Sequence, residues 1–126
     1  MRVLVCGSRT FSDKEYLFKS LDEIKSRFIF DVLIEGEASG ADSLAREWAE
    51  LNHIPVLKFP ANWKLYGRAA GPTRNRQMIK EGKPDAVIAF LDKPLSESKG
   101  TKNMLAQSKK ASLIIEIREL RVDTDE

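Results

Sequence analysis

The stretch RVLVCGSRTFSD, residues 2–13, decides the fold of this chain. Its opening run, RVLVC, predicts a short buried strand that ends at Gly7. Ser12 and Asp13 then offer a helix N-cap, and apolar residues follow at helical spacing between residues 17 and 28. A strand, a glycine turn and an amphipathic helix are the first half of a parallel β-α-β unit.

The same alternation continues along the chain. It predicts further strands at 31–35, 54–59, 84–91 and 112–117, helices at 40–52, about 72–81 and about 101–110, and long loops at 60–72 and 92–100. The strands are apolar throughout, as expected where helices cover both faces of a sheet. We therefore expect an α/β protein, a Rossmann-like three-layer α/β/α sandwich with a mainly parallel sheet of about five strands. It forms a single domain at 1–118, followed by a frayed acidic tail at 119–126.

Composition narrows the classes of function. The chain has 126 residues, of which 42% are hydrophobic and 32% charged, and its formal net charge is +2. This charge is too small for nucleic-acid binding by bulk electrostatics, so a nucleic-acid partner is not expected. Cys6 and His53 are the single cysteine and histidine, so we expect no disulfide, no metal site and no resident cofactor. No apolar run approaches the ~18 residues that span a bilayer, and no signal peptide precedes the first strand, so we expect a cytoplasmic protein without a membrane partner.

Ligands of open parallel sheets bind beyond the carboxyl ends of the strands. The segments at these ends are GSRTFSD (7–13), GEASGAD (36–42), PANWKLYGRAAGPTRNRQM (60–78) and LDKPLSESKGT (91–101). Glycines let backbone N–H groups approach the oxygens of a ligand, and Gly40–Ala41 and Gly100–Thr101 stand at helix starts, where the dipole favours negative charge. With Arg9 and Arg74, these segments predict a pocket for an anion such as a phosphate group.

The third segment carries the most specific candidates. We expect Pro72 to begin a helix, because a first turn tolerates its missing N–H, and Arg74 and Asn75 to contact the ligand from that turn. Trp63 allows two interpretations: its ring stacks on a base, or it anchors the long loop by packing. The chain contains neither G-x-G-x-x-G nor G-x-x-x-x-G-K-[ST], which disfavours ordinary dinucleotide binding and P-loop hydrolysis.

The segments GSRTFSD, GEASGADSLAREWA, FPANWKLYGRAAGPTRNRQM, PDAVIAF and SKGT, in this order, resemble the YspA-like family of the SLOG superfamily over roughly residues 3–117. This superfamily includes the Lonely Guy and lysine-decarboxylase-like proteins. The resemblance implies a Rossmann-like fold, a nucleotide or nucleotide-derived ligand and a homo-oligomer, and for some members a part in phage–host conflict. The candidate ligand-binding residues are then Gly7, Ser8, Arg9, Gly36, Ser39, Gly40, Ala41, Asp42, Trp63, Arg74, Asn75, Gly100 and Thr101.

Two departures from the family pattern affect the expected function. Glu37 and Ser39 stand where a glycine and an arginine are usual, which weakens binding of a fully charged phosphate or favours a ligand with a donor group. The related phosphoribohydrolases have a glutamate three residues after the Gly-Thr pair, and this position is Met104 here. Asp42 and Arg74 remain as weak catalytic candidates. We therefore favour sensing or sequestering of the ligand over its hydrolysis by a nucleoside-monophosphate N-glycosidase, with a nucleic-acid- or protein-interaction domain as a third hypothesis.

Overall fold

The computed structural model describes residues 1–120, and within them the chain forms one parallel sheet. Its strands are β1 (Arg2–Gly7), β2 (Val32–Glu35), β3 (Val56–Lys58), β4 (Ala86–Leu91) and β5 (Ile114–Glu119). The strand order is β3-β2-β1-β4-β5, and every pairing is parallel. The expected Rossmann-like α/β fold with a five-stranded sheet is therefore confirmed.

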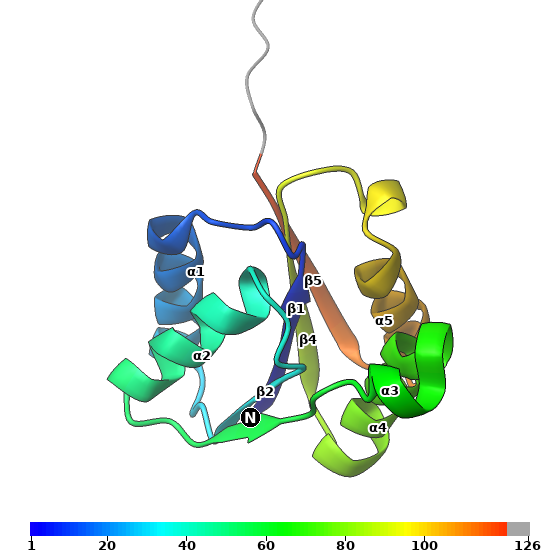
Figure 1. Cartoon of the computed structure of the whole chain (residues 1–126). Helices are drawn as coiled ribbons and strands as arrows, with labels where there is room; N and C mark the ends of the chain where they lie inside the picture. The colour runs from blue at the N-terminus through cyan, green and yellow to red at the C-terminus, as the bar shows by residue number, and fades with distance from the viewer. Residues whose placement is uncertain (121–126) are drawn as a thin grey trace, which may run out of the picture.

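Helices cover both faces of the sheet (Figure 1). On one face lie α1 (Lys14–Arg27) and α2 (Ala41–Leu51), and on the other lie α4 (Ala70–Gly82) and α5 (Lys99–Lys110), with α3 (Trp63–Tyr66) packed against α4. Two short 3-10 helices, η1 (Gly67–Ala69) and η2 (Leu95–Glu97), precede α4 and α5. The loops that follow β1 and β4 thus leave neighbouring strands toward opposite faces. The carboxyl edge opens between them, which is the place where ligands of such sheets bind.

Each face of the sheet has its own apolar cluster. One cluster joins β1, β2 and β4 to α1 and α2 around the buried ring of Trp48. The other joins the same strands to α4 and α5 and contains Met78 and Met104. The expectation that all strands are buried holds for the central ones only, because Ile114 and Ile117 on the edge strand β5 are exposed.

The predicted loop at 60–72 contains helical structure instead. Asn62 caps α3, and its Oδ1 accepts a hydrogen bond from the Leu65 N–H at 3.0 Å. Because α4 begins at Ala70, Pro72 is its third residue rather than its first. The N–H of a third helical residue has no partner within the helix, so proline is tolerated there too.

Three predicted boundaries also move. α4 runs through Gly82, where the sequence predicted its end. Gly82 packs closely on β2, since a Cβ there would lie 3.2 Å from Ile34 Cδ1. The residue in the left-handed conformation that ends the helix is Lys83, with φ +49°. α5 begins at Lys99, so the Gly-Thr pair lies inside its first turn. β5 extends to Glu119, beyond the domain end predicted at 118, and the remaining tail at 121–126 lies outside the described residues.

Candidate functional site

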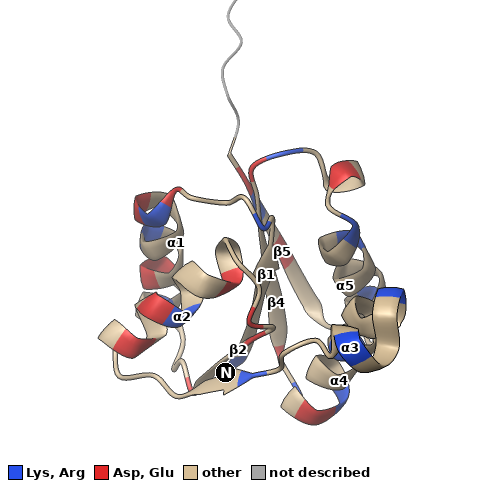
Figure 2. Cartoon of the chain, in the orientation of Figure 1, with Lys and Arg blue, Asp and Glu red and all other residues tan. Residues whose placement is uncertain are grey.

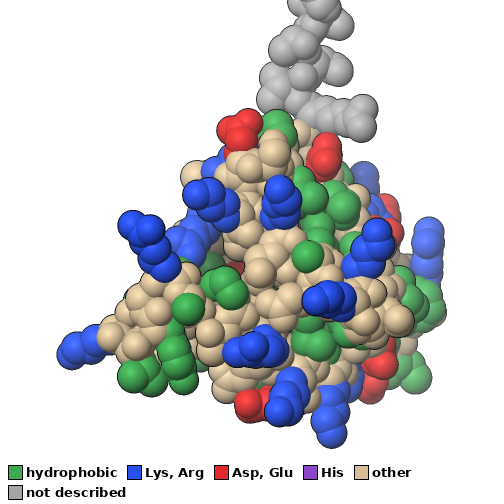
Figure 3. Space-filling view, turned by 90° about the vertical axis from the view of Figure 1, so that its right-hand side faces the viewer, with side chains coloured by type: hydrophobic (Ala, Val, Ile, Leu, Met, Phe, Trp, Pro, Cys, Tyr) green, Lys and Arg blue, Asp and Glu red, His purple; other side chains and the backbone are tan. Residues whose placement is uncertain are grey.

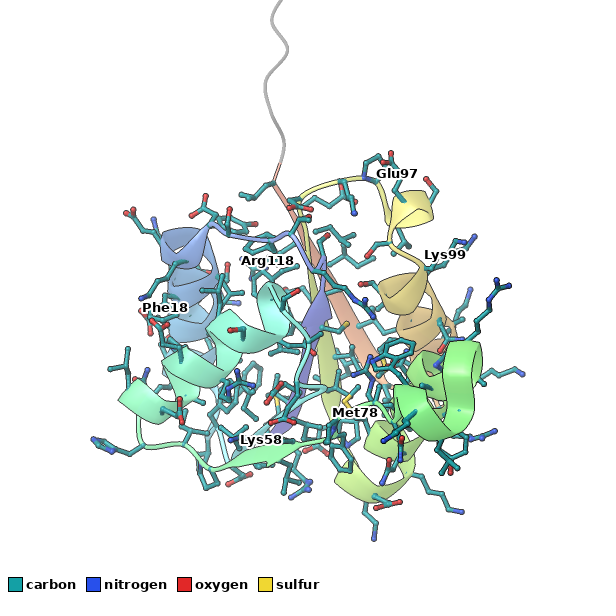
Figure 4. All side chains as sticks on the ribbon, in the orientation of Figure 1. Phe18, Lys58, Met78, Glu97, Lys99 and Arg118 are labelled. Atoms are coloured by element: carbon teal, nitrogen blue, oxygen red, sulfur yellow. The ribbon has the colours of Figure 1, made fainter. Side chains whose placement is uncertain are left out.

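A cavity of about 380 Å³ opens at the carboxyl edge of the sheet, beside the ends of β1 and β4 and the start of α5. Figure 4 labels Met78 between the sheet and α4, Glu97 on η2 and Lys99 at the beginning of α5. The charged residues that line this cavity are Arg9, Arg74, Lys93, Lys99, Asp42 and Glu97. Four basic side chains against two acidic ones give the cavity a positive balance.

The floor of this cavity is apolar. It is formed by Cys6 from β1, Met78 from α4 and Met104 from α5, all of them buried. Burial raises the pKa of the Cys6 thiol, so this cysteine stays protonated and does not act as a nucleophile. Met104 is 1% exposed and occupies the position where the resemblance implied a glutamate in the hydrolases. The floor therefore supplies shape but no acid or base.

The first turn of α5 is open to the cavity. Its first backbone hydrogen bond runs from the Lys102 N–H to the Ser98 carbonyl at 2.9 Å. Ser98 Oγ bonds to Thr101 Oγ1 at 3.0 Å and not to a backbone N–H, so no side chain of the described residues caps the helix. Within residues 1–120, the N–H groups of residues 99–101 have no hydrogen-bond partner, and all three residues line the cavity. The positive end of the α5 dipole therefore faces this space.

Arg74 contributes a buried guanidinium to the same cavity. The residue is 9% exposed; its Nη1 donates to the Gly36 carbonyl at 2.5 Å and its Nε to Asn75 Oδ1 at 3.1 Å. Its other guanidinium N–H groups have no partner in the described part of the chain. Burial lowers the pKa of Arg74 and the nearby Asp42 opposes this shift, but an arginine remains cationic at neutral pH. Arg74 can therefore donate charge-assisted hydrogen bonds to a ligand.

The Asn75 amide forms hydrogen bonds within the protein. Its Nδ2 donates to the Gly100 carbonyl at 3.2 Å and to Asn103 Oδ1 at 3.1 Å, while its Oδ1 accepts from Arg74. Asn75 is only 3% exposed. Both Nδ2 hydrogens are thus used within the protein, and donation to a ligand phosphate would break one of these bonds, so we assign Asn75 to positioning Arg74 and the start of α5.

The loop between β2 and α2 turns three successive N–H groups into the protein. Those of Gly36 and Ala38 donate to Asp42 Oδ2 at 3.0 and 3.3 Å, and that of Glu37 donates to Glu35 Oε1 at 2.5 Å. Burial raises the pKa of both carboxyls, and these N–H groups and nearby arginines oppose the shift. Because two buried carboxylates already occupy these donors, the loop has none of the three left for an external anion.

The N–H of Ala41 at the start of α2 is occupied, in contrast to the N–H groups of residues 99–101 in α5. Ala41 is fully buried, and its N–H donates to the Ser8 carbonyl at 3.3 Å. Gly40 has φ +75°, and a Cβ there would lie 2.6 Å from the carbonyl carbon of Arg9, so only glycine fits. Ser8, Gly40 and Ala41 pack the β1 loop against α2 and line neither cavity described in this section. The structure thus corrects the prediction that Ala41 presents a free N–H to an anion.

A second cavity, of about 330 Å³, adjoins the first and shares Arg9, Ala38 and Arg74 with it. Its other walls are Gly36, Glu37 and Ser39 on one side and Pro60, Ala61 and Trp63 on the other. Arg9 lies over the Trp63 ring, with its Cζ 5.4 Å from the ring centroid, a cation–π contact. Trp63 is 50% exposed, which favours the stacking interpretation over that of a buried anchor.

The motifs thus predicted much of the two cavity walls. Seven predicted residues line the first cavity and three others line only the second: Gly7, Arg9, Asp42, Arg74, Asn75, Gly100 and Thr101, and then Gly36, Ser39 and Trp63. The motifs missed Lys93, Lys99 and Ala38, which also line the first cavity. Lys93 and Lys99 could be predicted only from their position in the polar segment directly after the fourth strand.

Charge is unevenly distributed over the surface. The helices α3, α4 and α5 carry mainly lysine and arginine, whereas α2 carries mainly acidic residues (Figure 2). Figure 3 shows the face on the side of α3, α4 and α5, where basic side chains are spread widely and acidic ones are few. In the part of the chain that the structure describes, no three His, Cys, Asp or Glu side chains gather to hold a metal. None of the helices described here is long and apolar enough to cross a membrane.

The parallel sheet, its strand order and the polar cavity at its carboxyl edge define a Rossmann-like α/β protein. The model of the YspA, cpYpsA-related SLOG family matches residues 1–66. The Gene 61 protein of Mycobacterium phage D29 is 34% identical over 119 residues, which cover 89% of this chain and 91% of that protein. No solved structure matches this chain at a significant level. The chain belongs to the YspA, cpYpsA-related SLOG family, and this membership points to nucleotide-related binding.

Proposed function

We propose that this protein binds a nucleotide or a nucleotide-derived ligand, with a phosphate group in the first cavity. The observation that carries this proposal is the open first turn of α5. Its N–H groups have no partner within residues 1–120 and share the cavity with the buried guanidinium of Arg74. Helix N-termini and arginine both recur as phosphate-binding groups in proteins. Lys93 and Arg9 add positive charge, against the carboxylates of Asp42 and Glu97.

Binding without turnover fits this site better than hydrolysis. Cleavage of an N-glycosidic bond requires a carboxylate that stabilises the cationic sugar or activates water. The cavity floor has Met104 instead, and Asp42 Oδ2 already accepts two backbone hydrogen bonds. A protein that holds such a ligand intact senses or sequesters it. The similarity to a phage protein supports a role in phage–host conflict.

The substitution Lys93→Ala tests the phosphate site. Lys93 lines the cavity and makes no hydrogen bond or ion pair with residues 1–120, so its loss should leave the fold intact. We expect nucleoside monophosphates, but not the matching nucleosides, to raise the melting temperature. At 100 times the Kd, a ligand stabilises the folded state by about 2.7 kcal/mol. By calorimetry, Lys93→Ala should bind about tenfold more weakly, or about 1.4 kcal/mol.

Lys102→Ala is the matched control, because Lys102 is an exposed lysine of α5 that does not line the cavity. It should bind with the wild-type Kd. If no nucleotide of any base shifts the melting temperature, the proposal is wrong. It is wrong about the phosphate position if Lys93→Ala and Lys102→Ala bind equally well.

One observation favours the alternative, a nucleoside-monophosphate N-glycosidase. Asp42 lines the cavity and is 6% exposed, and burial raises its pKa, as in the general acids of many hydrolases. Chromatography of each common nucleoside monophosphate after incubation with the protein distinguishes the two functions. Repeated release of free base, lost in Asp42→Asn, would identify a hydrolase. Recovery of the intact nucleotide supports binding.

A further inference from the structure

The second cavity contains a carboxylate that has no partner in the described chain. Glu37 lines this cavity and is exposed, and among residues 1–120 its carboxylate accepts no hydrogen bond and forms no ion pair. Arg9 lines the same cavity, but its guanidinium lies over the ring of Trp63 instead. An ionised carboxylate is an acceptor only, so it suits a ligand group that donates hydrogen bonds.

The backbone holds Glu37 in an unusual conformation. Its φ is +54°, a left-handed value that is unfavourable for a residue with a Cβ. The N–H groups of Gly36, Glu37 and Ala38 are all bonded to the buried carboxylates of Glu35 and Asp42, and these bonds hold the loop in place. With its N–H groups turned inward, the loop leaves Glu37 exposed among the residues that line the cavity. Strain of this kind, maintained by neighbouring bonds, is concentrated at functional sites.

The two cavities are placed to hold one ligand. They meet at Arg9, Ala38 and Arg74, and the first contains the proposed phosphate position. The guanidinium of Arg9 and the indole of Trp63 give the second cavity a flat wall, on which a base can stack. A nucleotide with its phosphate at α5 would thus extend its base toward Trp63 and Glu37.

We propose that this base is guanine and that Glu37 is the residue that selects it. The N1–H and the exocyclic amino group of guanine are neighbouring donors on one edge, and they match the two oxygens of a carboxylate. Adenine and cytosine present a donor beside an acceptor, and uracil presents one donor between two acceptors, so none of them satisfies both oxygens. This inference rests on the proposed nucleotide binding and adds the residue that determines its specificity.

Calorimetric titration of GMP, IMP and AMP into the wild type and Glu37→Gln tests this inference. IMP retains N1–H but lacks the amino group, so it isolates one of the two hydrogen bonds. We expect the wild type to bind GMP about tenfold more tightly than IMP, and AMP more weakly than GMP. In Glu37→Gln, GMP and IMP should bind within about threefold of each other. Ribose 5-phosphate, which has no base, should bind equally to both proteins.

Two further variants control for the fold and for stacking. Glu37→Gly removes the carboxylate and places a glycine where φ is +54°, so it should lose the preference for GMP and melt at a higher temperature than the wild type. Trp63→Leu should weaken GMP and IMP by the same factor, because stacking does not distinguish their edges.

The outcomes separate this inference from the proposed function. If neither nucleotides nor ribose 5-phosphate bind, both are wrong. If binding depends on Lys93 but the wild type does not distinguish GMP from IMP, only the guanine assignment is wrong. The same holds if Glu37→Gln and Glu37→Gly both keep the wild-type preference for GMP.

Discussion

Replacing Gly100 by alanine should stabilise the fold and weaken nucleotide binding. Gly100 is the second residue of α5 and lines the first cavity, and a Cβ at this position would have no atom within 4 Å. No neighbour among residues 1–120 therefore requires a glycine here. Gly40, before α2, provides the contrast: its φ is +75°, and a Cβ would lie 2.6 Å from the carbonyl carbon of Arg9.

Gly100→Ala and Gly40→Ala should change the stability of the fold in opposite directions. Alanine favours a helix over glycine by up to about 1 kcal/mol in the interior and by less in the first turn, so Gly100→Ala should add about 0.5 kcal/mol, or ~2 °C in Tm. The new methyl group stands beside the unpaired N–H groups and should weaken binding about tenfold. Gly40→Ala should destabilise the fold by about 3 kcal/mol, or ~10 °C in Tm, because the left-handed backbone conformation and the close contact with Arg9 both disfavour a Cβ.

Urea and thermal unfolding measure the stability of both variants, and calorimetry with a nucleoside monophosphate measures the Kd of Gly100→Ala. Lys102→Ala again serves as the control on α5. A Gly100→Ala protein less stable than the wild type by about 1 kcal/mol would contradict the open space around this position. A wild-type Kd in Gly100→Ala would show that the phosphate does not approach the start of α5.

Two further substitutions test the polar groups around the site. Asp42→Asn should gain stability relative to the wild type as the pH rises from about 4 to neutral, because burial raises the pKa of Asp42. In the wild type, the protonated Asp42 carboxyl contributes to the free energy of unfolding. This contribution is fully present below the unfolded pKa of about 3.9 and is lost as the pH rises through the pKa of the folded state. Urea unfolding at several pH values checks this, and a constant difference would contradict it. Asn75→Ala should lower the free energy of unfolding by about 2 kcal/mol, or ~6 °C in Tm, because three polar groups of α4 and α5 lose a buried partner. Gln77 is an exposed residue of α4, so the control Gln77→Ala should unfold like the wild type.

The central strands were predictable from sequence, because burial on both faces makes each of them a continuous apolar run. The edge strand β5 and the short helices were less predictable. β5 contains Glu116 and Arg118, and its extent to Glu119 depends on pairing with β4, which no local pattern reports. The helices α3 and η1 are too short for a periodic signal, and the cap at Asn62 becomes informative only when its bond to Leu65 is known.

The site was predictable in location but not in detail. The rule that ligands bind at the carboxyl ends of strands selected loops that line the two cavities. The pairs Gly40–Ala41 and Gly100–Thr101 look alike in sequence, yet tertiary contacts treat them in opposite ways. The Ser8 carbonyl takes the N–H of Ala41, whereas no described residue takes the N–H groups at the start of α5. Whether the N–H groups of such a pair are occupied thus depends on residues far away in the chain.

Asp42 and Glu35 explain why one predicted anion site is closed and the other is open. Their buried carboxylates receive the N–H groups of the β2–α2 loop, so the protein's own charges occupy the donors that an external phosphate would use. Arg46 compensates Glu35 in an ion pair of 3.1 Å. Arg74 lies close enough to Asp42 to oppose the rise in the pKa of that carboxyl, and it retains N–H groups that no residue of the described chain pairs. The charge available to a ligand is therefore concentrated at Arg74 and α5. The same loop, where the sequence predicted an anion contact, instead places Glu37 among the residues that line the second cavity, and the group complementary to its carboxylate is a hydrogen-bond donor rather than a phosphate.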